Sequence, residues 1–187
     1  MRKIYILLTR SDTVLSRVVH LVTAARYTHV SIAFDEDLQT VYSSSRKNGR
    51  TLFPAGPCQE HLEQGYWSEH GHVPCILYEL QVSDQVYYAA RREVERILHR
   101  QEEYHFNILG LILCQMNIPF RRKHHFFCSQ FVGAVLGQSG ALCLPKDPSV
   151  MKPCDYMSMP ELACRFQGRL WELLRHRPAL AAAGETL

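Results

Sequence analysis

Five short stretches of the chain have hydrophobic patterns typical of β-strands. Residues 4–8 form a continuous apolar run, residues 28–34, 40–44 and 76–82 alternate between apolar and polar, and residues 165–170 have the character of a strand or an extended edge. In residues 28–34 the alternation predicts that Val30, Ile32 and Phe34 face the core. His29, Ser31 and Ala33 then share the opposite face of a half-buried strand.

Other segments repeat their apolar residues at helical spacing. Ser11–Asp12 and Ser83–Asp84 each provide an N-cap for such a segment, which predicts helices through residues 14–25 and 86–98. Residues 106–116 are apolar nearly all round, which is typical of a buried helix, and Pro119 is expected to end it. Residues 159–162 predict a short helix with Pro160 in its first turn.

Strands and helices in this order predict an α+β fold, with a mostly antiparallel sheet flanked by helices. A chain of 187 residues suits one domain with a sizeable core. No internal repeat or linker divides the sequence. We therefore expect one domain over residues 1–175, and a frayed tail over residues 176–187, where small and polar residues predominate.

Composition narrows the class of protein further. The formal net charge of +3 is too small to indicate a nucleic-acid-binding protein. Seven cysteines at irregular spacing favour reduced thiols in the cytoplasm over a disulfide framework. The apolar run at residues 4–8 is too short for a signal-peptide core, and residues 106–116 are too few to span a bilayer.

Cys128 is the first candidate for chemistry. The residues that follow it carry an apolar helical stripe, and Gly140 provides a stop, so the cysteine is expected in the first turn of a buried helix. Unpaired N–H groups and the helix dipole favour a thiolate there, and the same N–H groups can hold an oxyanion. The alternative is that Cys128 is a small hydrophobic residue buried for packing alone.

His29 is the second candidate, because a rigid strand holds a catalytic base well. A histidine followed at long range by a cysteine that opens a helix is the pattern of a Cys-His hydrolase, in which the two residues meet in space and not in sequence. The alternative is a structural histidine on a strand.

Together, Thr28-His29-Val30-Ser31-Ile32 and Phe127-Cys128-Ser129-Gln130-Phe131-Val132 resemble the circularly permuted branch of the NlpC/P60 (papain-like) cysteine peptidase superfamily. Residues 41–48 look like the second strand of the histidine hairpin in uncharacterised bacterial members. The resemblance implies a permuted papain-like fold with Cys128 as nucleophile and His29 as base. It also implies a third polar group that orients the histidine, and here the chain offers Ser43, with Ser44 as its neighbour and no carboxylate at the matching point.

The expected function is therefore a cysteine hydrolase, an amidase or peptidase, that acts through a covalent acyl-enzyme without a cofactor. Its substrate would be a small molecule, a peptide or an acyl compound. Two alternatives stay open at this point. One is a lipid acyltransferase or thioesterase, because related permuted proteins resemble lecithin:retinol acyltransferase, and the other is a non-catalytic binding module on the same fold.

Two further segments allow more than one interpretation. Residues 46–75 lack any period, so they favour an irregular lid, but they also hold five potential metal ligands: Cys58, His61, His70, His72 and Cys75. The basic run at residues 121–125 precedes the cysteine helix. It is either a solvated loop or a group of charges that attracts an anionic substrate or activates the thiol.

Overall fold

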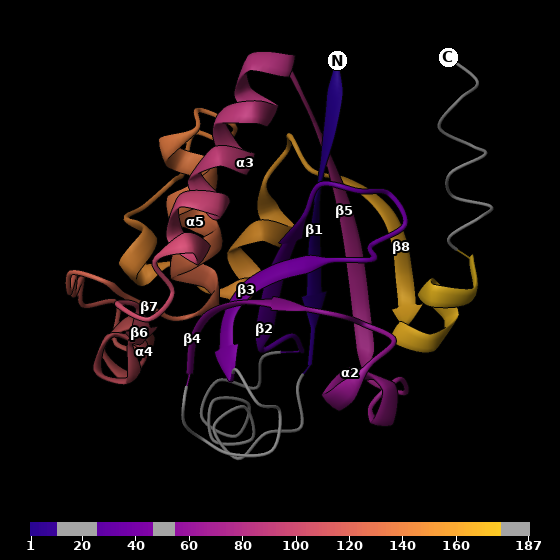
Figure 1. Ribbon diagram of the computed structural model, residues 1–187, viewed down its shortest axis with the longest axis horizontal. Coiled ribbons are helices and arrows are strands. Elements are labelled where there is room, and N and C mark those ends of the chain that lie inside the picture. The colour runs from indigo at the N-terminus through magenta and orange to yellow at the C-terminus, as the bar shows by residue number, and fades with distance from the viewer. Residues whose placement is uncertain (11–25, 47–54, 177–187) are drawn as a thin grey trace.

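The structure is a computed structural model, and it describes residues 1–10, 26–46 and 55–176 (Figure 1). Its strands are β1 (Arg2–Thr9), β2 (His29–Ala33), β3 (Val41–Arg46), β4 (Ala55–Glu60), β5 (Pro74–Val82), β6 (His105–Phe106), β7 (His125–Phe126) and β8 (Ala163–Arg169). Its helices are α2 (Gly65–Glu69), α3 (Asp84–His99), α4 (Ile108–Gln115) and α5 (Cys128–Gln138), with short 3-10 helices η1 (Pro148–Val150) and η2 (Pro153–Ser158). The helix expected over residues 14–25 and most of the expected tail lie outside the described residues.

Six of the strands form one antiparallel sheet in the order β4-β3-β2-β1-β5-β8, and β6 pairs with β7 in a separate parallel ladder. Helices α3 and α5 lie side by side over one face of this sheet, as Figure 1 shows. The α+β class and the antiparallel sheet flanked by helices are thus confirmed.

The sheet is buried on both faces. In β1, Ile4 and Ile6 belong to the hydrophobic cluster that includes residues of α3 and α5, whereas Tyr5 and Leu7 belong to a second cluster that includes Trp67 of α2. All five residues of β2 are buried for the same reason. The expectation of a half-buried strand at residues 28–34 is therefore wrong, because a second layer covers the face that carries His29.

The predicted helix boundaries hold for α3 and α5. The Ser83 hydroxyl accepts a hydrogen bond from the Val86 N–H at 3.3 Å and caps α3. Gly140, at φ +74°, adopts the left-handed backbone that follows the end of α5. The apolar stripe of α5 packs into the core as its spacing predicts.

Three predictions of local structure are wrong. The segment expected to be an irregular lid contains β4 and α2, and β4 accommodates Pro57 because it lies at the sheet edge, where a missing N–H costs little. Residues 160–161 form a turn, not a helix. Helix α4 is not buried, since only Gly110 and Cys114 are buried within it.

Among the described helices, none combines the length and the apolar character needed to cross a bilayer.

Candidate active site

Cys128 is the first residue of α5, and its N-cap residue Phe127 supplies no side-chain cap. The backbone N–H groups of the first turn therefore keep their capacity to bind an oxyanion. The thiol is 7% exposed, and its sulfur lies 4.0 Å from the carbonyl oxygen of Thr28, the residue before His29. Helix α5 thus brings the nucleophile candidate to the beginning of β2.

His29 is the first residue of β2 and pairs with Thr9 of β1. Its ring lies near enough to Cys128 for that side chain to help raise the pKa of the imidazole. The ring of Trp67, on α2, lies 5.7 Å from the His29 ring between centroids and helps to bury it. The two residues that the sequence pairs at long range therefore meet in space, on a rigid strand and a helix terminus.

Glu60, the last residue of β4, provides a carboxylate for His29. Its Oε2 atom lies 3.3 Å from the Nε2 atom of His29. The Ser31 hydroxyl lies 3.3 Å from the same Nε2 and donates to the same Oε2 at 3.3 Å. The other oxygen, Oε1, accepts a hydrogen bond from Ser45 at 2.6 Å. Both carboxylate oxygens are held, so the carboxylate has a fixed orientation toward the ring.

The charges of this pair reinforce each other. Burial of the His29 ring works to lower its pKa, but the Glu60 carboxylate and the hydrogen bonds with Cys128 and Glu60 outweigh burial and raise this pKa overall. Burial of Glu60 works to raise its pKa, but the charge of His29, the hydrogen bonds from His29 and Ser45, and the nearby Ser43 hydroxyl lower it overall. The ion pair is thus the favoured state near neutral pH.

The two serines proposed from the sequence have other surroundings. The Ser43 hydroxyl is buried without a hydrogen bond of normal geometry, although it lies near enough to Glu60 to help lower the pKa of that carboxyl. Ser44 donates to the carbonyl oxygen of Phe126 at 2.7 Å. The polar contacts that the structure gives the His29 ring go to Cys128, Glu60 and Ser31.

The sequence does not identify Glu60 as a site residue, because its segment lacks the regular alternation of apolar and polar residues that predicts a strand. Gly56 and Pro57 stand in the first half of β4, and both are unfavourable in strands. The signal that could have found it is the alternation of Cys58 and Glu60 with Gln59, in the segment between the predicted strands at residues 40–44 and 76–82. An antiparallel partner for that strand would place one such side chain beside the histidine face.

The five potential metal ligands of residues 58–75 do not converge. No group of three or more such side chains occurs among the described residues. His61 contacts the carbonyl oxygen of Gln39, and the His70 ring stacks on Tyr66 at 4.0 Å between centroids. Cys75 is buried in the sheet, where burial raises the pKa of its thiol to about 12.

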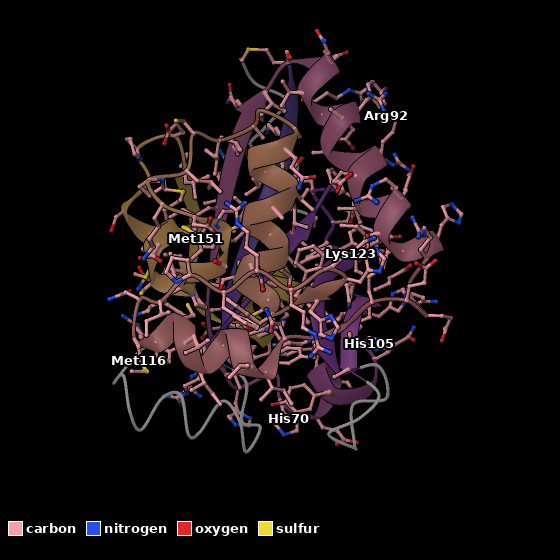
Figure 2. The ribbon with its side chains drawn as sticks, turned by 90° about the vertical axis from the view of Figure 1, so that its left-hand side faces the viewer. His70, Arg92, His105, Met116, Lys123 and Met151 are labelled. Atoms are coloured by element: carbon pink, nitrogen blue, oxygen red, sulfur yellow. The ribbon has the colours of Figure 1, made fainter. Side chains whose placement is uncertain are left out.

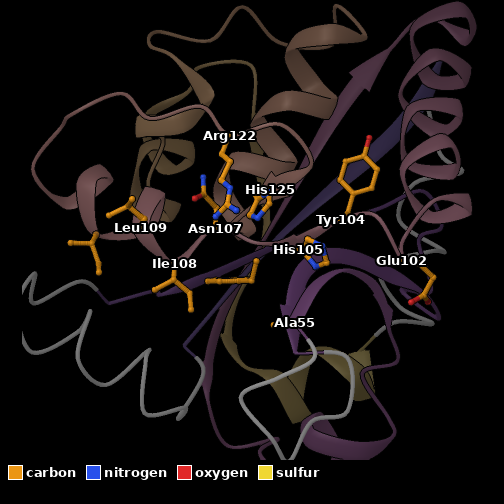
Figure 3. A pocket seen from close by; sticks show the side chains of 11 residues that line it. Ala55, Glu102, Tyr104, His105, Asn107, Ile108, Leu109, Arg122 and His125 are labelled. Carbon is orange, nitrogen blue, oxygen red and sulfur yellow. The ribbon is translucent and has the colours of Figure 1, made fainter.

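An open hollow of about 920 Å³ lies near the basic run and not at Cys128. Figure 3 shows Ile108 and Leu109 on one side of it, with Arg122, Asn107 and His125 grouped beside them. His125 belongs to β7, which directly precedes the segment that leads into α5. The hollow is therefore adjacent in the chain to the cysteine helix.

Comparison with protein-family models, curated proteins and solved structures gave no match to this chain.

Proposed function

We propose that the protein is a cysteine hydrolase that cleaves an amide bond through a covalent acyl-enzyme. The observation that carries this proposal is the grouping of Cys128, His29 and Glu60: His29 contacts Glu60 at 3.3 Å, and Cys128, at the beginning of a buried helix, lies near enough to raise the pKa of the ring. A nucleophile, a base in contact with it and a third group that orients the base form the arrangement used by cysteine hydrolases.

Acylation begins with the Cys128 sulfur attacking the carbonyl carbon of the substrate. In the resting ion pair the charged His29 ring already holds the proton that the Cys128 thiol gives up. Nδ1 is the ring nitrogen that carries it, because Nε2 is engaged by Glu60 and Ser31. The N–H groups of the first turn of α5 hold the tetrahedral oxyanion. His29 then returns the proton to the leaving nitrogen as the C–N bond breaks, which leaves a thioester on Cys128.

Deacylation uses the same groups in the reverse order. His29 takes a proton from a water molecule, and the resulting hydroxide attacks the thioester carbonyl. The C–S bond breaks, the sulfur leaves as a thiolate beside the charged His29 ring, and the carboxylic acid product leaves. Throughout this cycle the Glu60 carboxylate stabilises the positive charge on the His29 ring and fixes its orientation.

The same proposal includes the permuted papain-like type of fold. Support comes from the order of the residues along the chain, with His29 on a strand that precedes Cys128 at the start of a helix. The antiparallel sheet against which the helix packs is consistent with that type.

The test is turnover of a library containing amide, peptide, ester and thioester substrates by the wild-type chain and by Cys128→Ala. We expect amide hydrolysis that disappears in Cys128→Ala, and a trapped acyl-enzyme of increased mass on Cys128 in rapidly quenched samples. Preference for thioesters over amides would favour the lipid acyl alternative. Absence of both turnover and selective alkylation of Cys128 would contradict the enzyme and favour a binding module.

A further inference from the structure

The exposed apolar side chains of this protein are concentrated in one place. Among the described residues, nine large hydrophobic side chains are exposed, and five of them lie between positions 108 and 118. These five are Ile108, Leu109, Ile112, Met116 and Ile118, with exposed fractions of 40, 52, 54, 65 and 43%. We call these five residues the α4 patch. Scattered surface hydrophobics need no explanation, but a cluster of this kind marks a binding surface.

Helix α4 is held to the domain by little of its surface. Its buried residues are Gly110 and Cys114, and it packs against η1. Asn107 caps the helix by accepting a hydrogen bond from the Gly110 N–H at 3.0 Å. The helix is thus fixed at its start, while Ile108, Leu109 and Ile112 are exposed.

Positive charge lies directly beside the α4 patch. No Asp, Glu, Lys or Arg occurs from position 104 to position 120, and Arg121, Arg122 and Lys123 follow. Arg121 pairs with Asp147. Arg122 and Lys123 are exposed, and neither forms a salt bridge with another described residue. In Figure 2, Lys123 is labelled near the middle of the molecule and Met116 at its lower left, and Arg92 on α3 is labelled higher up.

Apolar and positively charged side chains both line the hollow described above. Ile108, Leu109 and Ile112 of the patch line it together with Arg122 and the histidines His105 and His125. The acidic residue on its lining, Glu102, lies at the far side from Ile108 and Leu109 in Figure 3. Apolar and cationic groups side by side fit a partner with an apolar body and an anionic head.

We propose that the α4 patch, with Arg122 and Lys123, binds the surface of an anionic lipid bilayer. With eight residues, α4 is about 12 Å long, so it lies in the interface and does not cross it. A second copy of the chain fits the charges less well, because a two-fold contact repeats the same cations on both sides. Anionic headgroups neutralise Arg122 and Lys123 while the acyl region receives Leu109, Ile112 and Met116. This inference does not depend on the proposed chemistry.

The test is co-sedimentation of the full chain with phosphatidylcholine vesicles that contain or lack phosphatidylglycerol. We expect binding to the vesicles that contain phosphatidylglycerol, and weakening of that binding by added salt, because salt screens the attraction. Arg122→Gln/Lys123→Gln should reduce the partition coefficient about 25-fold, since each cation near an anionic surface contributes about fivefold. Leu109→Ser/Ile112→Ser should reduce it about tenfold or more.

Matched controls distinguish binding by this surface from a general effect of net charge or of exposed hydrophobic side chains. Arg92→Gln/Arg169→Gln removes the same charge from α3 and from β8, at the far edge of the sheet, and Met157→Ser removes an apolar side chain that is also exposed. Both should leave the partition coefficient within about twofold of wild type, because these residues belong neither to α4 nor to the basic run. Far-ultraviolet circular dichroism verifies that each variant is folded.

Several outcomes would overturn the proposal. They are equal binding to vesicles without phosphatidylglycerol, no binding to either vesicle, or equal losses in the control variants. A concentration-dependent dimer that Leu109→Ser/Ile112→Ser abolishes would assign the patch to a second copy instead. The result is separable from the proposed function, because Cys128→Ala should bind vesicles as wild type does, and the patch variants should retain alkylation of Cys128.

Discussion

The Nε2 atom of His29 lies 3.3 Å from the Oε2 atom of Glu60, and both side chains are largely buried, at 9 and 12% exposure. The two residues come from β2 and β4, which are separated in the sheet by β3. This contact gives the histidine next to Cys128 a charged partner. It also makes the proposed catalytic group sensitive to a residue to which the sequence pattern assigned no role.

Replacing the carboxylate of Glu60 should slow the chemistry of Cys128. We expect Glu60→Gln to reduce iodoacetamide alkylation of Cys128, and turnover of any substrate, by about tenfold to a hundredfold at neutral pH, because an amide cannot stabilise the charged His29 ring. Quantitative peptide mapping measures the alkylation rate. Glu161→Gln, at an exposed position, is the matched control and should react as wild type does.

Ser43 provides the discriminating comparison. If the Glu60 carboxylate orients His29, Ser43→Ala should change the alkylation rate of Cys128 by less than about threefold, since its hydroxyl makes no hydrogen bond of normal geometry. A decrease in the alkylation rate as large as that in Glu60→Gln would instead assign the orientation of His29 to Ser43.

His29 should be required for the reactivity of Cys128. We expect His29→Ala to reduce the alkylation rate of Cys128 about a hundredfold or more, because it removes both the proton acceptor and the positive charge beside the sulfur. His99→Ala, on the exposed side of α3, is the control. An unchanged rate in His29→Ala would mean that the helix terminus alone activates the thiol.

The other cysteines should separate by burial. All seven are free thiols, of which Cys143, Cys154 and Cys164 are exposed. Burial raises the pKa of Cys114 to about 11 and that of Cys75 to about 12, so both should resist alkylation until the protein unfolds. In native protein near neutral pH we expect Cys128 to react first, ahead of the exposed thiols despite its burial. Labelling of an exposed thiol before Cys128 would contradict an activated nucleophile.

The ion pair between His29 and Glu60 should make the free energy of unfolding depend on pH. Because the pKa of Glu60 is lowered in the folded state, its contribution is present above its unfolded value near 4.5 and is lost as pH falls through the folded value. Because the pKa of His29 is raised, its contribution is complete below its unfolded value near 6.5 and is lost as pH rises through the folded value. The free energy of unfolding of the wild type should exceed that of Glu60→Gln most between about pH 4.5 and pH 6.5, the two unfolded values.

Urea unfolding of wild type and Glu60→Gln at a series of pH values measures this difference. We expect about 3 kcal/mol in the free energy of unfolding near pH 5.5, since the variant leaves His29 buried without its anionic partner. The difference should shrink toward pH 3 and toward strongly alkaline pH. A difference that is independent of pH would show that packing, and not charge, links the two side chains.

Sequence reasoning was effective where a local pattern determines the structure. The stripe that begins after Cys128 predicts α5 because each apolar residue recurs at helical spacing, and the Ser83 cap predicts the start of α3. Strands β2 and β3 follow from alternation alone. These signals lie within a few residues of each other, so no knowledge of the rest of the chain is needed.

It failed where the structure depends on distant partners. Strand β4 contains residues that disfavour strands, and it forms because it pairs with β3, so Glu60 could not be placed beside His29 from its own segment. Helix α4 has the apolar composition of a buried helix, but its burial depends on which elements pack against it. The same composition suits a core and an external apolar partner equally well.

The position of β4 at the edge of the sheet has a consequence for how the proposed activity responds to heating. Only one side of β4 pairs within the six-stranded sheet, so local opening of this strand costs less free energy than global unfolding. Such an opening withdraws Glu60 from His29 while β1, β2 and β5 keep their ladders. Thermal inactivation should therefore precede loss of secondary structure, and amide hydrogens of β4 should exchange with solvent ahead of those of β1.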